Sequence, residues 1–309
     1  MTQSPSSPPR LSIAQRVRTA TDGYPRQFWL LFWGILISSS AGSMVWPFLT
    51  IYMRERLQAP LSTITLLLTL NGVMGIAATF IAGPIVDRFG RKGPMLVSLL
   101  ANSAIMFAFS LVDTLGAWAV LVALMGALNP LYGVGSNAMI ADLVEPDRRA
   151  GAYSLLRMIA NLGVAIGPAV GGFVAAVSYM LAFRIAAGAN LVFAVLILLF
   201  VRETAPKKQH LETAPVEPVS PGKAKSGYGQ VLHDRTFVAF CSAYILASMA
   251  YALMMVLLSI YAKENFGMPE QYFGFIMSAN ALMVVLFQFS VTSVTKRHRA
   301  CLLYTSRCV

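Results

Sequence analysis

The sequence predicts an all-α integral membrane protein. Of its 309 residues, 57% are hydrophobic and 12% are charged, whereas soluble domains carry about 25% charged residues. The apolar residues form eight long stretches, each close to the roughly 20 residues that a helix needs to cross a bilayer. The net charge of +11 comes from Lys and Arg in small groups between these stretches, so we expect a lipid bilayer as partner and no nucleic acid.

Eight membrane-spanning helices are expected in chain order, after a polar N-terminal tail of residues 1–27. Six of them precede a polar break in the sequence and two follow it. The apolar stretches cover about residues 28–53, 61–82, 94–112, 116–140, 152–178, 181–201, 236–262 and 272–295. They predict a six-helix bundle over residues 28–201 and the first two helices of a second bundle over residues 236–295.

The loop charges predict the orientation in the membrane. When alternate loops are assigned to the two sides, 18 Lys and Arg residues fall on one side and 4 on the other. The more positive side of a multi-pass protein faces the cytoplasm. We therefore expect both termini in the cytoplasm and the protein in the inner or plasma membrane of the cell.

The segment of residues 202–235 is rich in Pro, Lys, Glu and Gly and predicts a flexible cytoplasmic linker. A sequence repeat crosses it: residues 49–71 align without gaps on residues 258–280, an offset of 209, and the two segments share Tyr, Glu, Pro and Asn at fixed spacing. This match predicts two parallel repeat units. A complete second unit would need four more spans, so we expect the basic cytoplasmic tail of residues 296–309 to be a truncation artefact.

A basic motif joins the second and third spans. It supplies a glycine for close helix contact, a carboxylate at a helix end, a glycine for a tight turn and positive charges that hold the loop in the cytoplasm. Its residues are Gly83, Asp87, Arg88, Gly90, Arg91 and Lys92. They match every defined position of the pattern G-x-x-x-D-R/K-x-G-R-R/K, and the chain therefore resembles the major facilitator superfamily of transporters.

That resemblance implies the superfamily's fold and a latch that closes the cytoplasmic side in the outward-facing state. Asp87 would be the acid of this latch. Asp142 at the end of the fourth span is a candidate partner for Arg91, and Arg157 in the fifth span is one for Asp87. Arg157 could equally extend to the membrane interface.

A glycine-rich motif in the fifth span has glycines at every fourth residue, which leaves a groove for a neighbouring helix, and a proline that bends the helix. The motif comprises Gly163, Gly167, Pro168, Gly171 and Gly172. It resembles a motif of bacterial drug/proton antiporters in the superfamily, except that Ser154 stands where the fuller pattern has another glycine. The resemblance favours export over import. Plain helix packing is the structural explanation of the motif, and it is also part of the role that the resemblance implies.

The candidate substrate cavity comes from polar and aromatic residues at helical spacing in the first and seventh spans, which the offset of 209 places on equivalent faces. Residues of the fourth and fifth spans complete the set. The candidates are Ser39, Ser43, Trp46, Asn129, Tyr132, Asn161, Tyr244, Ser248, Tyr251 and Met255. A second stripe in the second and eighth spans, Asn71/Gly75/Thr79 and Asn280/Val284/Gln288, either lines the cavity or joins helices by hydrogen bonds.

The predicted function is secondary active transport by alternating access, with drug or metabolite efflux coupled to protons as the leading form. The candidate cavity has no fixed charge, which suits a small neutral or weakly cationic amphipathic solute. None of the 13 acidic residues lies near the centre of a span. Protons would therefore be carried by residues outside this chain or by a peripheral group such as Asp87, or transport would be uncoupled.

Other function classes have less support. The three His residues lie in the linker or tail, and the three Cys residues have no metal-ligand spacing, so we expect no enzyme, no cofactor and no metal site. An importer or facilitator of the same superfamily is the first alternative. A non-transporting membrane scaffold fragment is the second, and under this alternative the chain with its incomplete second bundle should not transport.

Overall fold

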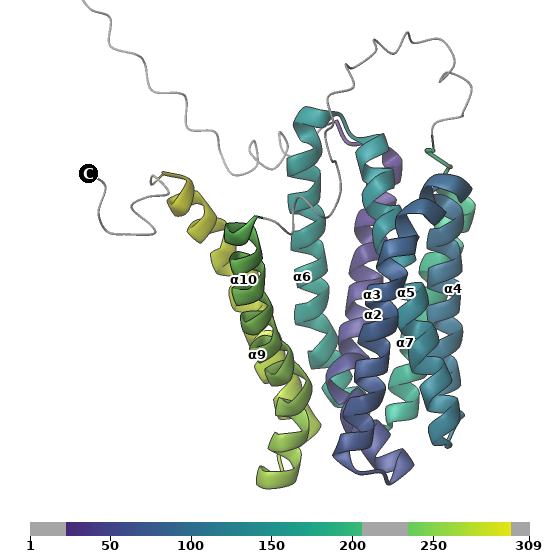
Figure 1. Cartoon of the computed structure of the whole chain (residues 1–309), viewed down its shortest axis with the longest axis vertical. Coiled ribbons are helices and arrows are strands. Elements are labelled where there is room, and N and C mark those ends of the chain that lie inside the picture. The colour runs from purple at the N-terminus through teal and green to yellow at the C-terminus, as the bar shows by residue number, and fades with distance from the viewer. Residues whose placement is uncertain (1–22, 206–233, 298–309) are drawn as a thin grey trace, which may run out of the picture.

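A computed structural model describes residues 23–205 and 234–297, and every regular element in these ranges is an α-helix (Figure 1). The helices follow one another with short connections, apart from the linker. They are α2 (Arg26–Leu57), α3 (Leu61–Phe89), α4 (Lys92–Phe109), α5 (Leu115–Leu143), α6 (Pro146–Val177), α7 (Tyr179–Phe200), α9 (Arg235–Phe266) and α10 (Glu270–Arg297). The tails and residues 206–233 of the linker lie outside the described residues.

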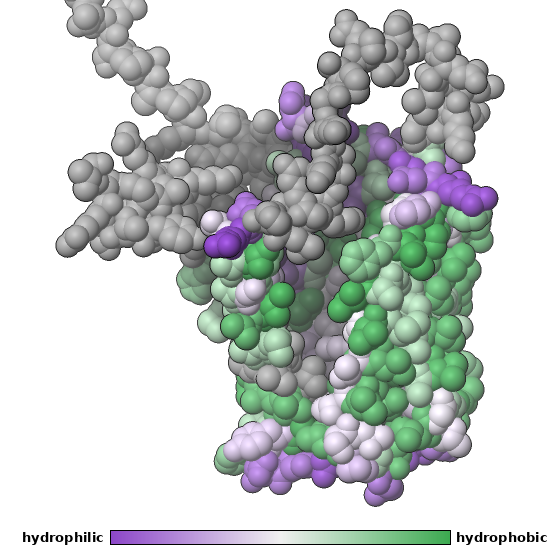
Figure 2. All heavy atoms as spheres, viewed as in Figure 1, coloured by the Kyte–Doolittle hydropathy of each residue, from purple (hydrophilic) through white to green (hydrophobic). Residues whose placement is uncertain are grey.

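Helices α2 to α7 are long and apolar enough to cross a membrane. Figure 2 shows the same character on the surface, where an apolar band covers the visible face of the molecule between hydrophilic rims at its two ends. The all-helical, multi-pass membrane class predicted from the sequence is thereby confirmed. Spans for α9 and α10, and the cytoplasmic position of the termini, stay predictions.

Local sequence signals set several helix ends. The hydroxyls of Thr114 and Ser178 accept hydrogen bonds from the N–H groups of Ala117 and Leu181 at the starts of α5 and α7, as N-capping residues do. Pro146 is the first residue of α6, where its missing N–H costs no helical hydrogen bond. These short interhelical turns keep consecutive helices antiparallel.

Helices α2 to α7 form one bundle, in which α2 packs on α6 and α7, α3 packs on α5, and α4 packs on α5 and α7. We call the end of the bundle with Gly90 and Val201 the linker end, and the end with Leu57 and Tyr179 the far end. A cluster that includes Phe109, Trp118 and Phe183 fills the far end, and another that includes Phe28 and Phe193 fills the linker end. The middle of the bundle is left between two closely packed apolar layers.

The α9–α10 hairpin repeats the α2–α3 hairpin. Three of its four helix bounds equal the corresponding bound of α2 or α3 plus 209, the offset found in the sequence, and the end of α10 differs by one residue. The turns agree as well, since Gln58 and Gly267 both end their helix with positive φ, 48° and 59°. The hairpin packs mainly through α10 on α6, so α6 lies between the hairpin and the rest of the bundle (Figure 1).

Candidate functional site

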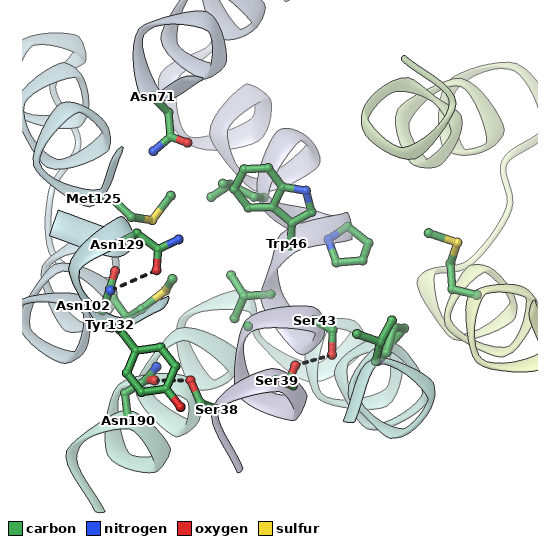
Figure 3. Close-up of a pocket in the computed structure, with 18 of the residues that line it drawn as sticks. Ser38, Ser39, Ser43, Trp46, Asn71, Asn102, Met125, Asn129, Tyr132 and Asn190 are labelled. Atoms are coloured by element: carbon green, nitrogen blue, oxygen red, sulfur yellow. Dashed lines mark hydrogen bonds between the residues drawn. The ribbon is translucent and has the colours of Figure 1, made fainter. Parts of the chain in front are cut away.

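A cavity of about 700 Å³ occupies the middle of the molecule, between the two apolar clusters (Figure 3). Residues of α2 to α7 and of α10 line it, and no Lys, Arg, Asp or Glu is among them. The lining divides by chemistry into two parts. One part lies inside the bundle and is rich in amides, and the other faces α6 and α10 and is apolar.

The amide-rich part, here called the polar lobe, contains the side chains of Asn102, Asn129, Tyr132 and Asn190 (Figure 3). The Nδ2 of Asn102 lies 3.5 Å from the Oδ1 of Asn129, to which it donates a long hydrogen bond. Asn190 is buried and accepts a hydrogen bond of 3.2 Å from the Ser38 hydroxyl. The polar lobe therefore offers hydrogen-bonding groups without a formal charge.

The other part, here called the apolar lobe, is formed by Trp46 of α2, Val164 and Pro168 of α6, and Met277 and Ala281 of α10. Trp46 keeps 42% of its surface exposed, and Figure 3 shows its ring between the two lobes. An indole ring is a broad apolar surface with one hydrogen-bond donor. This lobe suits the hydrocarbon or aromatic part of an amphipathic molecule.

Five of the ten predicted cavity residues line the cavity, and they are Ser39, Ser43, Trp46, Asn129 and Tyr132. Asn161, Tyr244 and Ser248 do not. Tyr244 and Ser248 belong to the part of α9 between residues 242 and 250, all of whose side chains are exposed because this half of α9 does not pack on the bundle. The side chains of Tyr251 and Met255 lie outside the described residues.

Sequence reasoning missed three polar residues of the cavity, Ser38, Asn102 and Asn190. Asn102 and Asn190 are isolated amides within apolar spans, and such residues are rare in membrane helices unless they pair or serve a function. That signal was available in the sequence. From the alternative stripe, Asn71 and Asn280 also line the cavity, while Asn71 donates a hydrogen bond of 3.0 Å to the carbonyl of Val122.

The glycine motif of α6 has two contact faces. Gly163, Gly167 and Gly171 face the backbone of α2, where a Cβ on Gly167 would come within 2.0 Å of the Ser43 hydroxyl and 2.6 Å of the Ser40 carbonyl. On another face, a Cβ on Gly172 would come within 2.8 Å of the Glu270 carbonyl on α10. Helix α6 thus joins the bundle to the hairpin through contacts that only very small residues allow.

Gly274 of α10 completes this contact from the other side. A Cβ on Gly274 would lie 2.3 Å from the Pro168 carbonyl oxygen. The apolar lobe begins directly beside this crossing, since Pro168 and Met277 both line it. A change in how α6 and α10 cross would therefore change the shape of the cavity.

At the linker end, the motif between α3 and α4 forms a tight turn around the carboxylate of Glu203. Gly90 has φ of +89°, and a Cβ there would come within 2.5 Å of Glu203. The N–H groups of Arg91 and Lys92 donate to the two carboxylate oxygens at 2.8 and 3.0 Å. Glu203, which the sequence analysis missed, therefore caps the start of α4.

The pKa of Glu203 reflects this cap. Partial burial raises the pKa of its carboxyl, but the N–H groups of Arg91, Ala205, Lys92 and Thr204 donate hydrogen bonds to the charged form and together hold the pKa below its ordinary value. The Lys92 ammonium also donates to the carbonyl of Leu198 near the end of α7, at 2.9 Å. The loop is thus fastened to the end of the same bundle.

Among the predicted latch residues, the structure brings Arg91 to Asp142, with Nε 3.0 Å from Oδ2, and to Asp87, with Nη1 3.5 Å from Oδ1. Asp87 forms its described ion pair with Arg91 and not with Arg157, which lies exposed farther along α6. Nor does Gly83 make the close helix contact expected of it, because a Cβ there would meet no described atom within 4 Å.

The remaining charged residues of interest lie at the far end, where they join α2 to the hairpin. Arg54 pairs with Glu264 at 2.9 Å, and Lys263 pairs with Glu55. Lys263 also pairs at 2.7 Å with Glu270, which accepts a hydrogen bond from the Tyr179 hydroxyl at 2.7 Å. We call these five ionised residues the far-end cluster, namely Arg54, Glu55, Lys263, Glu264 and Glu270.

Comparison with known proteins places this architecture. The uncharacterized MFS-type transporter YqjV of Bacillus subtilis is 26% identical over 87% of this chain and 65% of its own length. The Na(+), Li(+), K(+)/H(+) antiporter of Planococcus maritimus is 27% identical over 81% of this chain and 64% of its own length. The chain thus spans less than two thirds of these relatives.

A solved structure has the same fold. A POT family transporter in complex with 5-aminolevulinic acid superposes with a TM-score of 0.64 at 16% identity, over 90% of this chain and 71% of that one. The sequence profile of the family described as the Major Facilitator Superfamily matches residues 31–307. The family expected from the loop motif is confirmed, and the chain belongs to the Major Facilitator Superfamily.

Proposed function

We propose that this chain forms the substrate cavity of a secondary transporter that moves a small, neutral or weakly cationic amphipathic solute by alternating access. The uncharged, two-lobed cavity carries this proposal. Its position between the bundle and the hairpin is where transporters built from parallel repeats bind their substrates. A fixed charge on the substrate would have no oppositely charged partner among the lining residues.

The contacts between bundle and hairpin support a rocking motion. They include the α6–α10 crossing, where backbones touch at glycines, the far-end cluster, and an apolar cluster in which Phe48 of α2 packs on Phe273 of α10. Ion pairs that are partly exposed hold weakly and exchange readily with water. The far-end cluster therefore serves as a reversible closure on one side of the cavity, and the turn around Glu203 serves as a fixed support on the other.

Efflux is the direction we propose. Multidrug resistance protein 1 of Bacillus subtilis is 28% identical over 67% of this chain and 51% of its own length, and its name denotes resistance to drugs. The name of the Planococcus maritimus relative, a Na(+), Li(+), K(+)/H(+) antiporter, supports exchange with protons. In the described part of this chain, the acidic groups available for proton exchange are peripheral ones, such as Asp87, Asp142 and Glu270.

The test uses the weakly basic dye Hoechst 33342. Everted membrane vesicles that contain the chain should accumulate the dye when a proton gradient is applied, and Trp46→Ala should lower accumulation about tenfold by removing the main apolar wall. Binding of the dye to the chain in nanodiscs is measured in parallel. Gly188→Ala is the matched control, because a Cβ there would meet no described atom within 4 Å.

The outcomes separate the parts of the proposal. Proton-driven accumulation that Trp46→Ala reduces supports export through this cavity. Binding that depends on Trp46 without any movement of dye would overturn transport by this chain and leave a binding half. Dye binding that Trp46→Ala does not weaken would contradict the assignment of the cavity itself.

A further inference from the structure

We propose that the polar lobe recognises the amide edge of its substrate: the transported molecule carries a carboxamide, lactam, imide or urea group next to an apolar body. The Asn102–Asn129 pair makes this recognition. The inference rests on the proposed function of the cavity and specifies the substrate class that it takes.

The first argument concerns the free groups of the Asn pair. An asparagine amide has one carbonyl oxygen and two N–H donors. The single hydrogen bond from Asn102 to Asn129, long at 3.5 Å, uses one N–H of the first and part of the oxygen of the second. The Oδ1 of Asn102 and the Nδ2 of Asn129 make no other hydrogen bond with a described residue, so one acceptor and one donor of the pair are left for a ligand.

An amide supplies both complements, because its N–H can donate to the Oδ1 of Asn102 and its carbonyl can accept from the Nδ2 of Asn129. A single asparagine reads adenine by a related pairing of its own carbonyl and N–H with the base. An ester or ether can accept a hydrogen bond from the Nδ2 of Asn129 but has no N–H to donate to the Oδ1 of Asn102. That oxygen is then left without a partner inside the protein, which lowers the affinity. The polar lobe therefore favours an amide over an isosteric ester.

Tyr132 supports the same reading. Its hydroxyl oxygen is buried and makes no hydrogen bond of good geometry with a described residue, although the Ser136 hydroxyl lies near it. Figure 3 shows the Tyr132 ring beside the Asn pair and Asn190. A buried hydroxyl without a partner costs free energy until a ligand supplies one. Tyr132 thus provides a further donor or acceptor for the polar group of the substrate.

The two lobes orient the substrate. The amide enters the polar lobe, while the apolar body lies against Trp46 and between Pro168 and Met277, where α6 meets α10. Since α10 belongs to the hairpin and Asn102 and Asn129 belong to the bundle, one molecule contacts both moving parts. An amide at one end and an apolar body at the other are together required to bridge them.

The experiment measures binding of four probes of one shape to the chain in nanodiscs, with empty nanodiscs as the blank. The probes are 4-butylbenzamide, methyl 4-butylbenzoate, 4-butylbenzamidinium and 4-butylbenzoate. We expect the benzamide to bind about tenfold more tightly than the ester, in line with one lost hydrogen bond, and more tightly than either ion, because no lining residue neutralises a charge.

Two variants make the assignment specific. Asn102→Ala removes the acceptor that only the amide N–H can use, and should therefore bring the benzamide and the ester to nearly equal affinity. Asn129→Asp replaces the donor with a carboxylate, so the amidinium should become the preferred probe by about tenfold through a paired, charge-assisted contact. Gly188→Ala should keep the preference of the original chain, and Trp46→Phe should weaken all four probes by similar factors.

Equal binding of benzamide and ester to the unaltered chain, with Trp46→Phe still weakening both, would overturn the amide assignment and leave the proposed cavity intact. An Asn129→Asp variant that binds the other three probes but does not favour the amidinium would also contradict it. Failure of every probe to bind a chain that unfolds cooperatively on heating would overturn this inference and the cavity function together.

Discussion

At the scale of single residues, the glycines of α6 determine how closely the helices approach. Glycine costs a helix about 1 kcal/mol relative to alanine, so the four glycines of the α6 motif need a compensating contact. At Gly167 that contact is with the backbone of Ser40 and Met44 on α2, at distances that no Cβ tolerates. The glycines lower the helical propensity of α6, and the close packing that they allow offsets this loss.

Gly167→Ala is therefore expected to destabilise the protein by about 1–3 kcal/mol, because the added methyl group forces α2 and α6 apart. The thermal unfolding midpoint in detergent measures this. Gly188→Ala on α7 adds the same methyl group where no described atom lies within 4 Å and should leave the midpoint unchanged or raise it. If Gly167→Ala also left the midpoint unchanged or raised it, close packing of α2 on α6 at Gly167 would not limit the stability of the protein.

At the scale of elements, the α3–α4 turn shows how one carboxylate organises a loop. Gly90 supplies the positive φ, the start of α4 supplies N–H donors, and Glu203 from the end of α7 accepts them. Arg91 then extends to Asp142 on α5. One short motif thus connects four helices at the linker end, which makes this end a rigid base for the bundle.

Glu203→Gln should loosen this turn, since a neutral amide accepts the N–H hydrogen bonds more weakly than a carboxylate does. We expect trypsin to cleave after Arg91 about fivefold faster, as measured by the rate at which the intact chain disappears. Glu145→Gln is the matched control, because Glu145 lies at the same end and its side chain caps no helix.

The same cap predicts a pH dependence. The pKa of Glu203 is lower in the folded chain than its ordinary value, so the carboxylate contributes stability at neutral pH, and this contribution is lost as the pH falls through that lowered pKa. The difference in cleavage rate between Glu203→Gln and the unaltered chain should therefore shrink in acid, as a protease active at low pH would show. A difference independent of pH would contradict the cap.

At the scale of the whole molecule, the repeat explains the far-end cluster. The offset of 209 relates Arg54 to Lys263 and Glu55 to Glu264, and the observed pairs are Arg54 with Glu264 and Lys263 with Glu55. Each repeat therefore contributes one cation and one anion, and the pairs are reciprocal, as in the interface of a symmetric dimer. Two ion pairs thus join the two hairpins at the far end, and both pairs are formed by the same two positions of the repeat.

Reversing one pair tests this arrangement. Arg54→Glu alone places two carboxylates together and should lower the unfolding midpoint, and Glu264→Arg alone should do likewise. The double variant restores opposite charges and should recover most of the loss, with a coupling free energy of about 0.5–1 kcal/mol for such partly exposed residues. Added salt should reduce every difference.

Arg56 and Asp113 supply the control for this cycle, because this ion pair joins α2 to the α4–α5 connection within the bundle. Its reversal should not restore an Arg54→Glu variant. Strictly additive effects of Arg54→Glu and Glu264→Arg would show that the two residues do not act on each other, and the closure of the far end would then rest on packing alone.

Much of this architecture follows from local sequence. Apolar runs of membrane length predicted each of α2 to α7. The offset of 209 predicted that the second hairpin copies the first, which holds to the residue at three helix bounds and to within one residue at the fourth. The positions of Trp46, Asn129 and Tyr132 in the cavity also followed from helical spacing. These features depend on hydrophobicity and on a period of 3.6 residues, both of which can be read along a single chain.

Only the tertiary structure decided which distant residues meet. Glu203 lies 112 residues from Arg91, Asn190 lies 152 residues from Ser38, and the exposed half of α9 holds Tyr244 and Ser248 away from the cavity. Helical spacing assigns a residue to a face but does not say which helix covers that face. That choice depends on how closely neighbouring helices approach, which the glycine contacts of α6 determine in three dimensions.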